Sequence, residues 1–338
     1  MKKITVDVKH KQYDIILERG CIQHLSHYFD TSMKFFILTD QNIPDQWIQL
    51  VKQQCPNSTI HRVHGGEESK SIVTYEECLK AMLQFHMGRN DVLIALGGGV
   101  IGDLGGFVAA SYMRGIRFIS IPTTTLSQID SSIGGKVAVN LGEVKNIVGA
   151  FYHPEIVLID FDTLTTLPHR HVINGLIEAL KAGLIHDEKL FSLFEKGKWQ
   201  DNLEEIIYRS LQMKKRVVEQ DETEQGLRKT LNFGHTIGHG IEAYYHLDQY
   251  YHGECVAMGM LYFIDDSEVK KRVLAIYEKM GILPSVPLDI DQVYALTTMD
   301  KKAQGNRITV VKVKHPGESY LETIEKEEIK TILKRGAL

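Results

Sequence analysis

The amino-acid sequence predicts an α/β fold in two parts, a mostly parallel sheet domain followed by a mainly α-helical domain. In the first half, short apolar runs alternate with segments whose apolar residues recur at helical spacing. After about residue 162, helical spacing dominates. Alternating strands and helices are typical of a parallel sheet covered by helices, because parallel strands need long crossover connections.

The first domain, residues 1–162, is expected to open with a hairpin formed by ITVDV and YDIILE. Further strands are predicted at FFILTD (35–40), TIHRV (59–63), DVLIALGGG (91–99), FISIPTTT (118–125) and IVLID (156–160), and helices at 72–87, closed by Gly88, and at IGDLGGFVAASYM. Ligands of such sheets bind at the carboxyl ends of the strands. The small and polar residues at these ends therefore predict a binding site.

The second domain, residues 163–338, is predicted to be mainly helical. Helical spacing covers 170–186, 187–196, 201–219, 232–246 and 252–265. Two late strands, ITVVKVK and ESYLETI, precede a helix with a basic end.

The composition narrows the class of protein. A chain of 338 residues is long enough for two domains with proper cores. A formal charge of -4 gives no basic excess for nonspecific nucleic-acid binding, and no run approaches the roughly 18 apolar residues of a membrane span. The N-terminus lacks the apolar core of a signal peptide, and the four cysteines are scattered without a CxxC pair. We therefore expect a cytoplasmic protein without nucleic-acid or membrane partners.

A glycine-rich turn, GGGVIG (97–102), stands between a predicted strand and a predicted helix. This G-x-G-x-x-G pattern lets the backbone approach a pyrophosphate at a helix N-terminus, so it predicts a Rossmann-like nucleotide site. A tight turn with close helix–strand packing is the alternative. The acid expected about 20 residues downstream is missing from FISIPTT, and the candidates for the ribose lie upstream at Asp40 and Asn42. Asp103 is unusual so near a phosphate site.

The stretch SQIDSSIGGKVAVN (127–140) offers Asp130, paired glycines and Lys136, and Lys145 and Asn146 follow. A lysine after paired glycines is typical of an anion contact made with backbone amides. It is equally typical of a flexible surface loop, and the residues alone leave both interpretations open.

A candidate metal site involves His235, His239 and His252, which lie within residues 234–253. Residues four apart share a helix face, so His235 and His239 could touch one ion. Glu178 is the best oxygen ligand, because a glutamate in the apolar segment NGLIEALKAGLI is costly unless it is paired or bound to metal. A surface ion pair with Lys181 is the alternative. Two histidines and a carboxylate are the ligand set of a catalytic zinc, and Thr236 stands where a zinc protease has its glutamate, which argues against a peptidase.

Over nearly its whole length the chain resembles the 3-dehydroquinate synthases of the shikimate pathway. The resemblance is carried, in order, by GGEESK, ALGGGVIGDLGGFVAASYMRG, PTTTLSQIDSSIGGK, KNIVGAF, TLP, GLIEALK, KKRVVEQDETEQGLRKTLNFGHTIGHGIEA, HGECVAMGM and DKK. The glycerol dehydrogenases and iron-dependent alcohol dehydrogenases are more distant and share only the general architecture. Thr125 departs from the leucine that the family often has at this position.

The resemblance implies three sets of site residues. Zinc or cobalt is implied at Glu178, His235 and His252, with His239 beside the substrate. NAD is implied at Asp40, Asn42, Glu67, Lys70, Gly98, Gly99, Asp103, Thr123, Thr124, Asp130, Lys145 and Thr166. The substrate, 3-deoxy-D-arabino-heptulosonate 7-phosphate, is implied at Arg114, Lys136, Asn146, Lys181, Lys214, Glu224, Arg228, Asn232 and one of Lys301 or Lys302. Arg114 is implied to reach across the interface of a homodimer.

The resemblance also implies the chemistry. NAD transiently oxidises the C5 hydroxyl, phosphate leaves by elimination, the hydride returns, and ring opening with aldol closure gives 3-dehydroquinate. This is carbon–oxygen (phosphorus–oxygen) lyase chemistry on the route to chorismate and the aromatic amino acids. The alternatives are a related sugar-phosphate cyclase, a metal-dependent polyol dehydrogenase and a non-catalytic relative. Arg228 disfavours a cyclase that makes an inosose, because that substrate has no carboxylate to pair with it.

Overall fold

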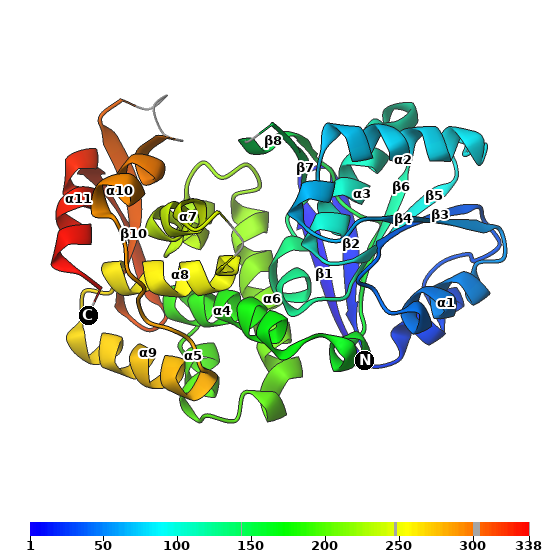
Figure 1. The fold of residues 1–338 in the computed structure, drawn as a ribbon. Coiled ribbons are helices and arrows are strands. Elements are labelled where there is room, and N and C mark those ends of the chain that lie inside the picture. The colour runs from blue at the N-terminus through cyan, green and yellow to red at the C-terminus, as the bar shows by residue number, and fades with distance from the viewer. Residues whose placement is uncertain (143, 247–248, 300–304, 338) are drawn as a thin grey trace. The chain divides into compact units, whose positions relative to one another are not determined.

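The computed structural model describes residues 1–142, 144–246, 249–299 and 305–337. It divides the chain into two compact units, Met1–Val172 and Ile173–Leu338 (Figure 1). This division falls later than the boundary expected near residue 162. The segment Phe161–Thr166 belongs to unit 1, where Thr166 accepts a hydrogen bond from the indole of Trp47 and Thr163 accepts one from Gln128.

Unit 1 contains a seven-stranded sheet with the order β1-β2-β9-β6-β5-β3-β4. The strands are β1 (Lys2–Val8), β2 (Lys11–Leu17), β3 (Phe35–Asp40), β4 (Ser58–Val63), β5 (Val92–Gly97), β6 (Arg117–Pro122) and β9 (Ile156–Ile159). Only the β1–β2 pairing is antiparallel in this sheet, so the predicted opening hairpin and the mostly parallel sheet are confirmed.

Both faces of this sheet are covered by helices (Figure 1). Successive residues of a strand point to opposite faces. Phe35 and Ile37 therefore pack in one core cluster with α1 (Asp45–Gln54), and Phe36 and Leu38 pack in another with α2 (Ile72–Gln84) and α3 (Gly99–Ser111). Burial on both sides explains why β3 is apolar almost throughout.

Two details of unit 1 differ from the sequence expectations. The helix expected over 72–87 ends at Gln84, and its closing left-handed residue is His86 (φ 53°) instead of Gly88. Hydrogen bonds from Met87 N to Met82 O and from His86 N to Leu83 O form a Schellman motif, which ends the helix before the glycine.

The second difference concerns residues 136–151, for which no strand was predicted. They form an antiparallel hairpin of β7 (Lys136–Leu141) and β8 (Val144–Phe151). Val137 and Val139 of β7 are buried on the side of α3, whereas the outer residues of β8 are exposed. Lys136 therefore begins a regular strand, and the flexible-loop interpretation is wrong for its position.

Unit 2 is mainly helical, as predicted. Its elements are α4 (His169–His186), which begins in unit 1, α5 (Glu188–Glu195), α6 (Leu203–Gln220), α7 (His235–Tyr244), α8 (His252–Met260), α9 (Ser267–Met280), α10 (Ile290–Met299), the hairpin β10 (Arg307–His315) and β11 (Glu318–Glu325), and α11 (Lys326–Arg335). The helices α1, α9 and α10 were not predicted. Among the described residues, no helix is long and apolar enough to cross a bilayer.

Close packing of α7 against α8 positions the candidate metal site. A Cβ on Gly259 would lie 2.0 Å from the carbonyl oxygen of Gly234, so glycine permits this approach. The predicted helix 232–246 begins only at His235, because Gly234 is left-handed (φ 78°) and Leu227–Asn232 is a 3-10 turn. The predicted helix 252–265 ends at Met260, where the 3-10 turn Leu261–Phe263 follows.

Candidate metal centre and cofactor site

Glu178 lies in the interior of unit 2, on the fully buried stretch of α4. Its side chain is 2% exposed, and the ammonium of Lys181 lies 2.5 Å from its Oε2. Lys181 also donates a hydrogen bond to the carbonyl oxygen of Leu231. The pair is therefore an internal one, and the alternative of a surface ion pair is wrong.

Two imidazoles converge on the same carboxylate. The Nε2 atoms of His235, at the start of α7, and His252, at the start of α8, each lie 3.7 Å from Oε1 of Glu178. The Nδ1 atom of His235 faces the carbonyl oxygen of Phe233 at 3.1 Å, and that of His252 faces Oε2 of Glu242 at 3.1 Å. An oxygen faces each Nδ1, so a neutral imidazole would donate from Nδ1–H and carry its lone pair on Nε2, the atom that faces Glu178.

The donor set fits a divalent cation. Oε1 of Glu178 is buried and accepts no hydrogen bond from the described residues, which is costly for a carboxylate oxygen without a cation. One carboxylate and two imidazoles with an open position are the ligands of catalytic zinc sites. His239 is more exposed, and ligand atoms of the three histidines lie within 4.8 Å of one another. Its implied place beside the substrate stays a prediction.

The charges of the centre perturb each other strongly. Burial raises the pKa of Glu178, but Lys181, His235 and His252 outweigh burial and hold this pKa well below its usual range. Burial and the charge of Lys181 lower the pKa of His235. For His252 burial acts in the same direction, but the carboxylates of Glu178 and Glu242 outweigh it and raise the pKa to about 9. A cation at Nε2 would take the place of the proton there.

Further predicted substrate residues of unit 2 lie on α6 and on the segment that follows it. Lys214 on α6 and Arg228 on the following 3-10 turn are buried. The amide of Asn232 donates a hydrogen bond to Oε1 of Glu224 over 2.7 Å, and Glu224 has a left-handed backbone (φ 63°). Buried cations are suited to bind an anionic substrate, because a low-dielectric site strengthens their attraction. Lys301 and Lys302 lie outside the described residues.

The predicted cofactor residues of unit 1 gather where parallel strands end. Asp40 ends β3, Gly98 and Gly99 follow β5, and Thr123 and Thr124 follow β6. The carboxyl ends of these neighbouring strands meet at one edge of the sheet. Oδ1 of Asp40 accepts a hydrogen bond from the backbone N–H of Asn42, whereas burial raises the pKa of this carboxyl.

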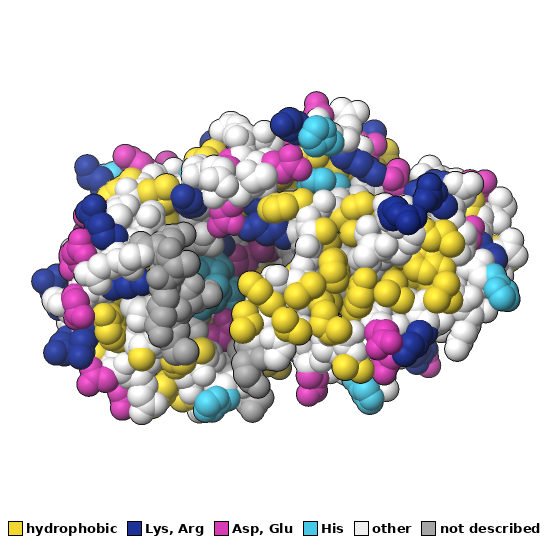
Figure 2. Space-filling model, turned by 90° about the horizontal axis from the view of Figure 1, so that it is seen from above, with side chains coloured by type: hydrophobic (Ala, Val, Ile, Leu, Met, Phe, Trp, Pro, Cys, Tyr) yellow, Lys and Arg dark blue, Asp and Glu magenta, His cyan; other side chains and the backbone are white. Residues whose placement is uncertain are grey.

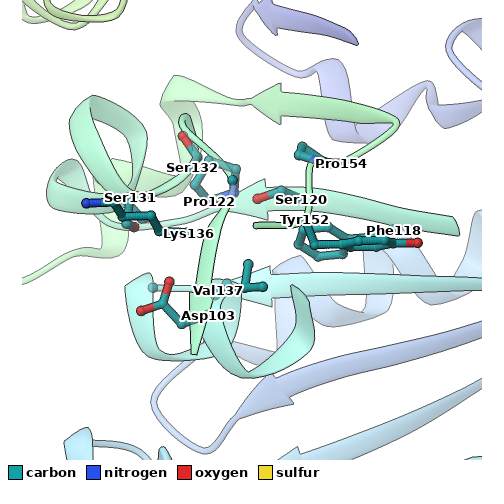
Figure 3. A pocket seen from close by; sticks show the side chains of 15 residues that line it. Asp103, Phe118, Ser120, Pro122, Ser131, Ser132, Lys136, Val137, Tyr152 and Pro154 are labelled. Atoms are coloured by element: carbon teal, nitrogen blue, oxygen red, sulfur yellow. The ribbon is translucent and has the colours of Figure 1, made fainter. Parts of the chain in front are cut away.

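Asp103 is explained by a buried partner. The ammonium of Lys70 lies 2.5 Å from Oδ2 of Asp103 and 4.0 Å from Oε1 of Glu67. Asp103 in the first turns of α3 is therefore neutralised by a lysine. Figure 3 shows Asp103, Ser131 and Lys136 gathered at one end of a small pocket, which the glycine turn also lines.

The other predicted residues of unit 1 lie on separate elements. Asp130 belongs to the turn Ser127–Ser131, Lys145 is on β8, and Thr166 ends the turn Phe161–Thr166. Arg114 and Asn146 are exposed and have left-handed backbones (φ 68° and φ 55°). Lys136, Arg114 and Asn146 thus belong to unit 1, whereas the remaining described substrate residues belong to unit 2.

Several polar residues that hydrogen-bond to the candidate site residues, or to the backbone beside them, were not predicted from the sequence. Glu242 and Asn174 contact the segment of His252, Asn140 links Glu67 to Asn146, and Asp221 caps the turn before Arg228. Glu242 had a signal, because it stands seven residues after His235 on the same helix face. Asn174 had the signal that revealed Glu178, a polar residue in an apolar helix.

Fold and site define a class: a two-unit α/β protein with a nucleotide-type sheet unit and a helical unit that carries a candidate metal centre. Two family models match, 3-dehydroquinate synthase N-terminal at residues 60–174 and 3-dehydroquinate synthase C-terminal at residues 175–303. The 3-dehydroquinate synthase of Clostridium botulinum (strain Alaska E43 / Type E3) is 40% identical, covering 98% of this chain and all of its own. The chain belongs to the 3-dehydroquinate synthase family.

Solved structures of related enzymes share the fold. A 2-deoxy-scyllo-inosose synthase complexed with carbaglucose-6-phosphate, NAD+ and Co2+ has a TM-score of 0.87 at 24% identity, covering 99% of this chain and all of its own. The 2-epi-5-epi-valiolone synthase of Streptomyces hygroscopicus subsp. jinggangensis 5008, with NAD+ and Zn2+ bound, has a TM-score of 0.86 at 25% identity, covering 97% and 98%. Both are less similar in sequence than the dehydroquinate synthase relative, so a different cyclase is not favoured.

Proposed function

We propose that this chain is a 3-dehydroquinate synthase, which converts 3-deoxy-D-arabino-heptulosonate 7-phosphate to 3-dehydroquinate and phosphate. The observation that carries the proposal is the buried Glu178 carboxylate, which two imidazole Nε2 atoms face at 3.7 Å in a chain of this family. Phosphate leaves by elimination, so the enzyme is a carbon–oxygen lyase. A cytoplasmic location remains a prediction from the sequence.

Glu178, His235 and His252 would hold a divalent cation, which when bound supplies a Lewis acid that lowers the pKa of a substrate hydroxyl. The residues at the strand ends of unit 1 would hold NAD, which supplies a reversible hydride acceptor and so leaves no net oxidation. The side chains of the protein itself would orient the substrate and the cofactor and neutralise the negative charges of the substrate. No residue is needed to activate water, which agrees with Thr236 in place of a glutamate.

The cations of unit 2 are arranged for an acid with a phosphate. Lys181 is fixed by Glu178 and by the Leu231 carbonyl, so its ammonium is held beside the metal position. Arg228 is 3% exposed and donates to the carbonyl oxygen of Glu222, which fixes its guanidinium. A polyol dehydrogenase acts on uncharged substrates and has no use for several buried cations. This charge pattern favours the proposed substrate over a polyol.

Phosphate release and absorbance at 340 nm test the proposal in one assay. The protein is mixed with NAD and 3-deoxy-D-arabino-heptulosonate 7-phosphate before and after chelation. Metal-dependent phosphate release without net NADH is the expected result. Net NADH would instead indicate a dehydrogenase, and absence of phosphate release from metal- and NAD-loaded protein would reject this substrate.

We also propose a homodimer that forms through unit 1. Figure 2 shows hydrophobic side chains gathered over the face that carries α2 and the β7–β8 hairpin. The exposed members on these elements are Ile72, Val73, Leu83, Leu141, Val144, Ile147 and Phe151. A patch of this kind marks an interaction surface, and a second copy is the occupant that the family resemblance suggests.

Ile147→Lys should give monomers in light scattering, and Leu283→Lys, at an exposed leucine of unit 2, should not. A dimeric Ile147→Lys variant would place the interface elsewhere.

A further inference from the structure

The geometry points to Glu242 as a positioning residue, which holds the imidazole of His252 in the orientation that binds the cation. The inference rests on the proposed metal site and adds a residue to it. Glu242 is on α7, and Oε2 lies 3.1 Å from Nδ1 of His252. The carboxylate accepts from Nδ1–H, so the neutral imidazole keeps its lone pair on Nε2, 3.7 Å from Oε1 of Glu178.

Helix geometry explains why Glu242 can do this. His235, His239 and Glu242 stand at positions i, i+4 and i+7 of α7, and such positions share one helix face. That face therefore carries the candidate ligand His235 and also Glu242, which contacts His252, the candidate ligand on α8. The two candidate histidine ligands differ in their support, since His235 faces the carbonyl of Phe233 and His252 faces a carboxylate. A charged acceptor forms the stronger hydrogen bond with Nδ1–H. This bond makes the imidazole Nε2 a better electron-pair donor to the cation.

The backbone next to His252 is fixed by α4. The N–H of Gly253 donates to Oδ1 of the buried Asn174 over 2.6 Å. Asn174 stands one turn before Glu178, so a single helix carries both a ligand and the group that anchors the neighbouring one. A Cβ on Gly253 would lie 2.2 Å from the carbonyl oxygen of Asn174, which excludes larger residues there. With its backbone fixed, His252 can still turn about its side-chain bonds, and Glu242 stops this rotation.

Three variants of Glu242 separate positioning from charge. Glu242→Gln keeps the reach and an accepting oxygen but removes the charge. Glu242→Asp keeps the charge but withdraws it by one methylene, and Glu242→Ala removes both. Glu195→Ala is the matched control, because Glu195 also belongs to unit 2 and binds Arg272 through both oxygens. Loss of a group that hydrogen-bonds to a metal ligand typically weakens metal binding by about 10–100-fold.

The measurement is the zinc Kd of the metal-free full-length protein, obtained by competition with a chelating dye, together with the absorption spectrum of the cobalt(II) form. We expect about 10–100-fold weaker zinc binding for Glu242→Ala, a larger loss for Glu242→Asp than for Glu242→Gln, and no change for Glu195→Ala. Altered cobalt bands in the alanine variant would support a changed ligand geometry. Thermal unfolding of the metal-free forms separates this effect from a general loss of stability.

Two results would overturn the inference. One is a zinc Kd of Glu242→Ala within about twofold of the parent, well below the expected loss. The other is full affinity in Glu242→Asp with a large loss in Glu242→Gln, which would assign the effect to charge. If Glu242→Ala does not fold, the aspartate and glutamine variants decide between these results. Failure of the parent itself to bind zinc would instead refute the metal site, so the two failures are distinguishable.

Discussion

The side-chain amide of Asn140 donates a hydrogen bond to Oε1 of Glu67 over 2.9 Å. The oxygen of the same amide accepts the backbone N–H of Asn146, also over 2.9 Å, where the chain is left-handed. One asparagine of β7 thus joins a predicted NAD residue to a predicted substrate residue. Its own backbone N–H donates to the carbonyl oxygen of Lys70, which anchors the asparagine next to Glu67.

Substitution of Asn140 should therefore separate the two binding functions. Asn140→Asp loses the donor to Glu67 and places a like charge there, but it still accepts from Asn146. We expect about tenfold weaker NAD binding with little change in the substrate KM. Asn140→Ala should impair both. The NAD Kd is measured by fluorescence and the KM by phosphate release, with Asn57→Ala as a control that also removes an amide donor. Equal effects of both variants on both constants would refute the division of roles.

Gly65 offers a second test of the cofactor site. A Cβ at this position would lie 1.8 Å from Nδ2 of Asn42. Because the obstacle is the end of a side chain, Gly65→Ala should displace Asn42 and leave the fold intact. We expect weaker NAD binding at a nearly unchanged Tm. Gly88→Ala is the matched control, since its Cβ would make an ordinary contact with Asp91. Unchanged NAD affinity in Gly65→Ala would remove Asn42 from the site.

The sequence predicted the central strands of the seven-stranded sheet well, because their burial on two faces leaves long apolar runs. The sequence singled out Glu178 as a candidate site residue for a related reason, since a charged residue within an apolar helix is conspicuous. The helix α9 was missed although Asp266 caps its N-terminus and Gly281 ends it in a left-handed conformation. Helix α1 has Pro44 at its N-cap and no side-chain capping bond, so its start carried no capping signal.

The supporting residues of the site were harder to predict. Asn140 contacts Glu67, which is distant in the sequence, and no local pattern marks such a pair. The hairpin β7–β8 was missed because the paired glycines before it and its own polar residues are typical of a loop, whereas its inner valines pack on the side of α3. Tertiary packing thus decided what local composition left open.

Asp221 allows a test by pH. Its carboxylate accepts the backbone N–H groups of Gln225, Gly226 and Arg228. Burial raises the pKa of Asp221, but these three hydrogen bonds and the charge of Arg228 together outweigh burial and lower the pKa below the usual 3.8. A lowered carboxyl pKa contributes stability above the unfolded-state pKa, and this contribution is lost as pH falls through the folded-state pKa. The Tm deficit of Asp221→Asn should therefore shrink as the pH falls from about 5 to below 3.8.

A pH-independent deficit in Asp221→Asn would contradict the role of the carboxylate charge. The same variant should raise the substrate KM, because the turn that carries Arg228 loses charged acceptors for its backbone. Asp289→Asn is a suitable control, since Asp289 accepts similar backbone bonds from Asp291 and Gln292 at the start of α10.

Arg228 itself should contribute to binding of the anionic substrate. Arg228→Ala removes a buried cation, and we expect a loss of about 10–100-fold or more in kcat/KM with zinc content unchanged. Arg228→Lys keeps the charge but not the planar donor pair, so it should recover only part of the loss. Arg209→Ala controls for loss of a partly buried arginine of unit 2. An unchanged kcat/KM in Arg228→Ala would remove this residue from the site.

Removal of a predicted ligand should separate the metal from the cofactor. His252→Ala takes away one of the two imidazoles that face Glu178, whereas all the predicted NAD residues belong to unit 1. We therefore expect loss of bound zinc and of phosphate release, with the NAD Kd nearly unchanged. Zinc is measured by elemental analysis and NAD binding by fluorescence in the metal-free forms. His186→Ala, at a histidine of α4 that is hydrogen-bonded to Thr230, should keep its zinc. Full zinc occupancy in His252→Ala would refute the ligand assignment, and loss of NAD binding would show that the two sites depend on each other.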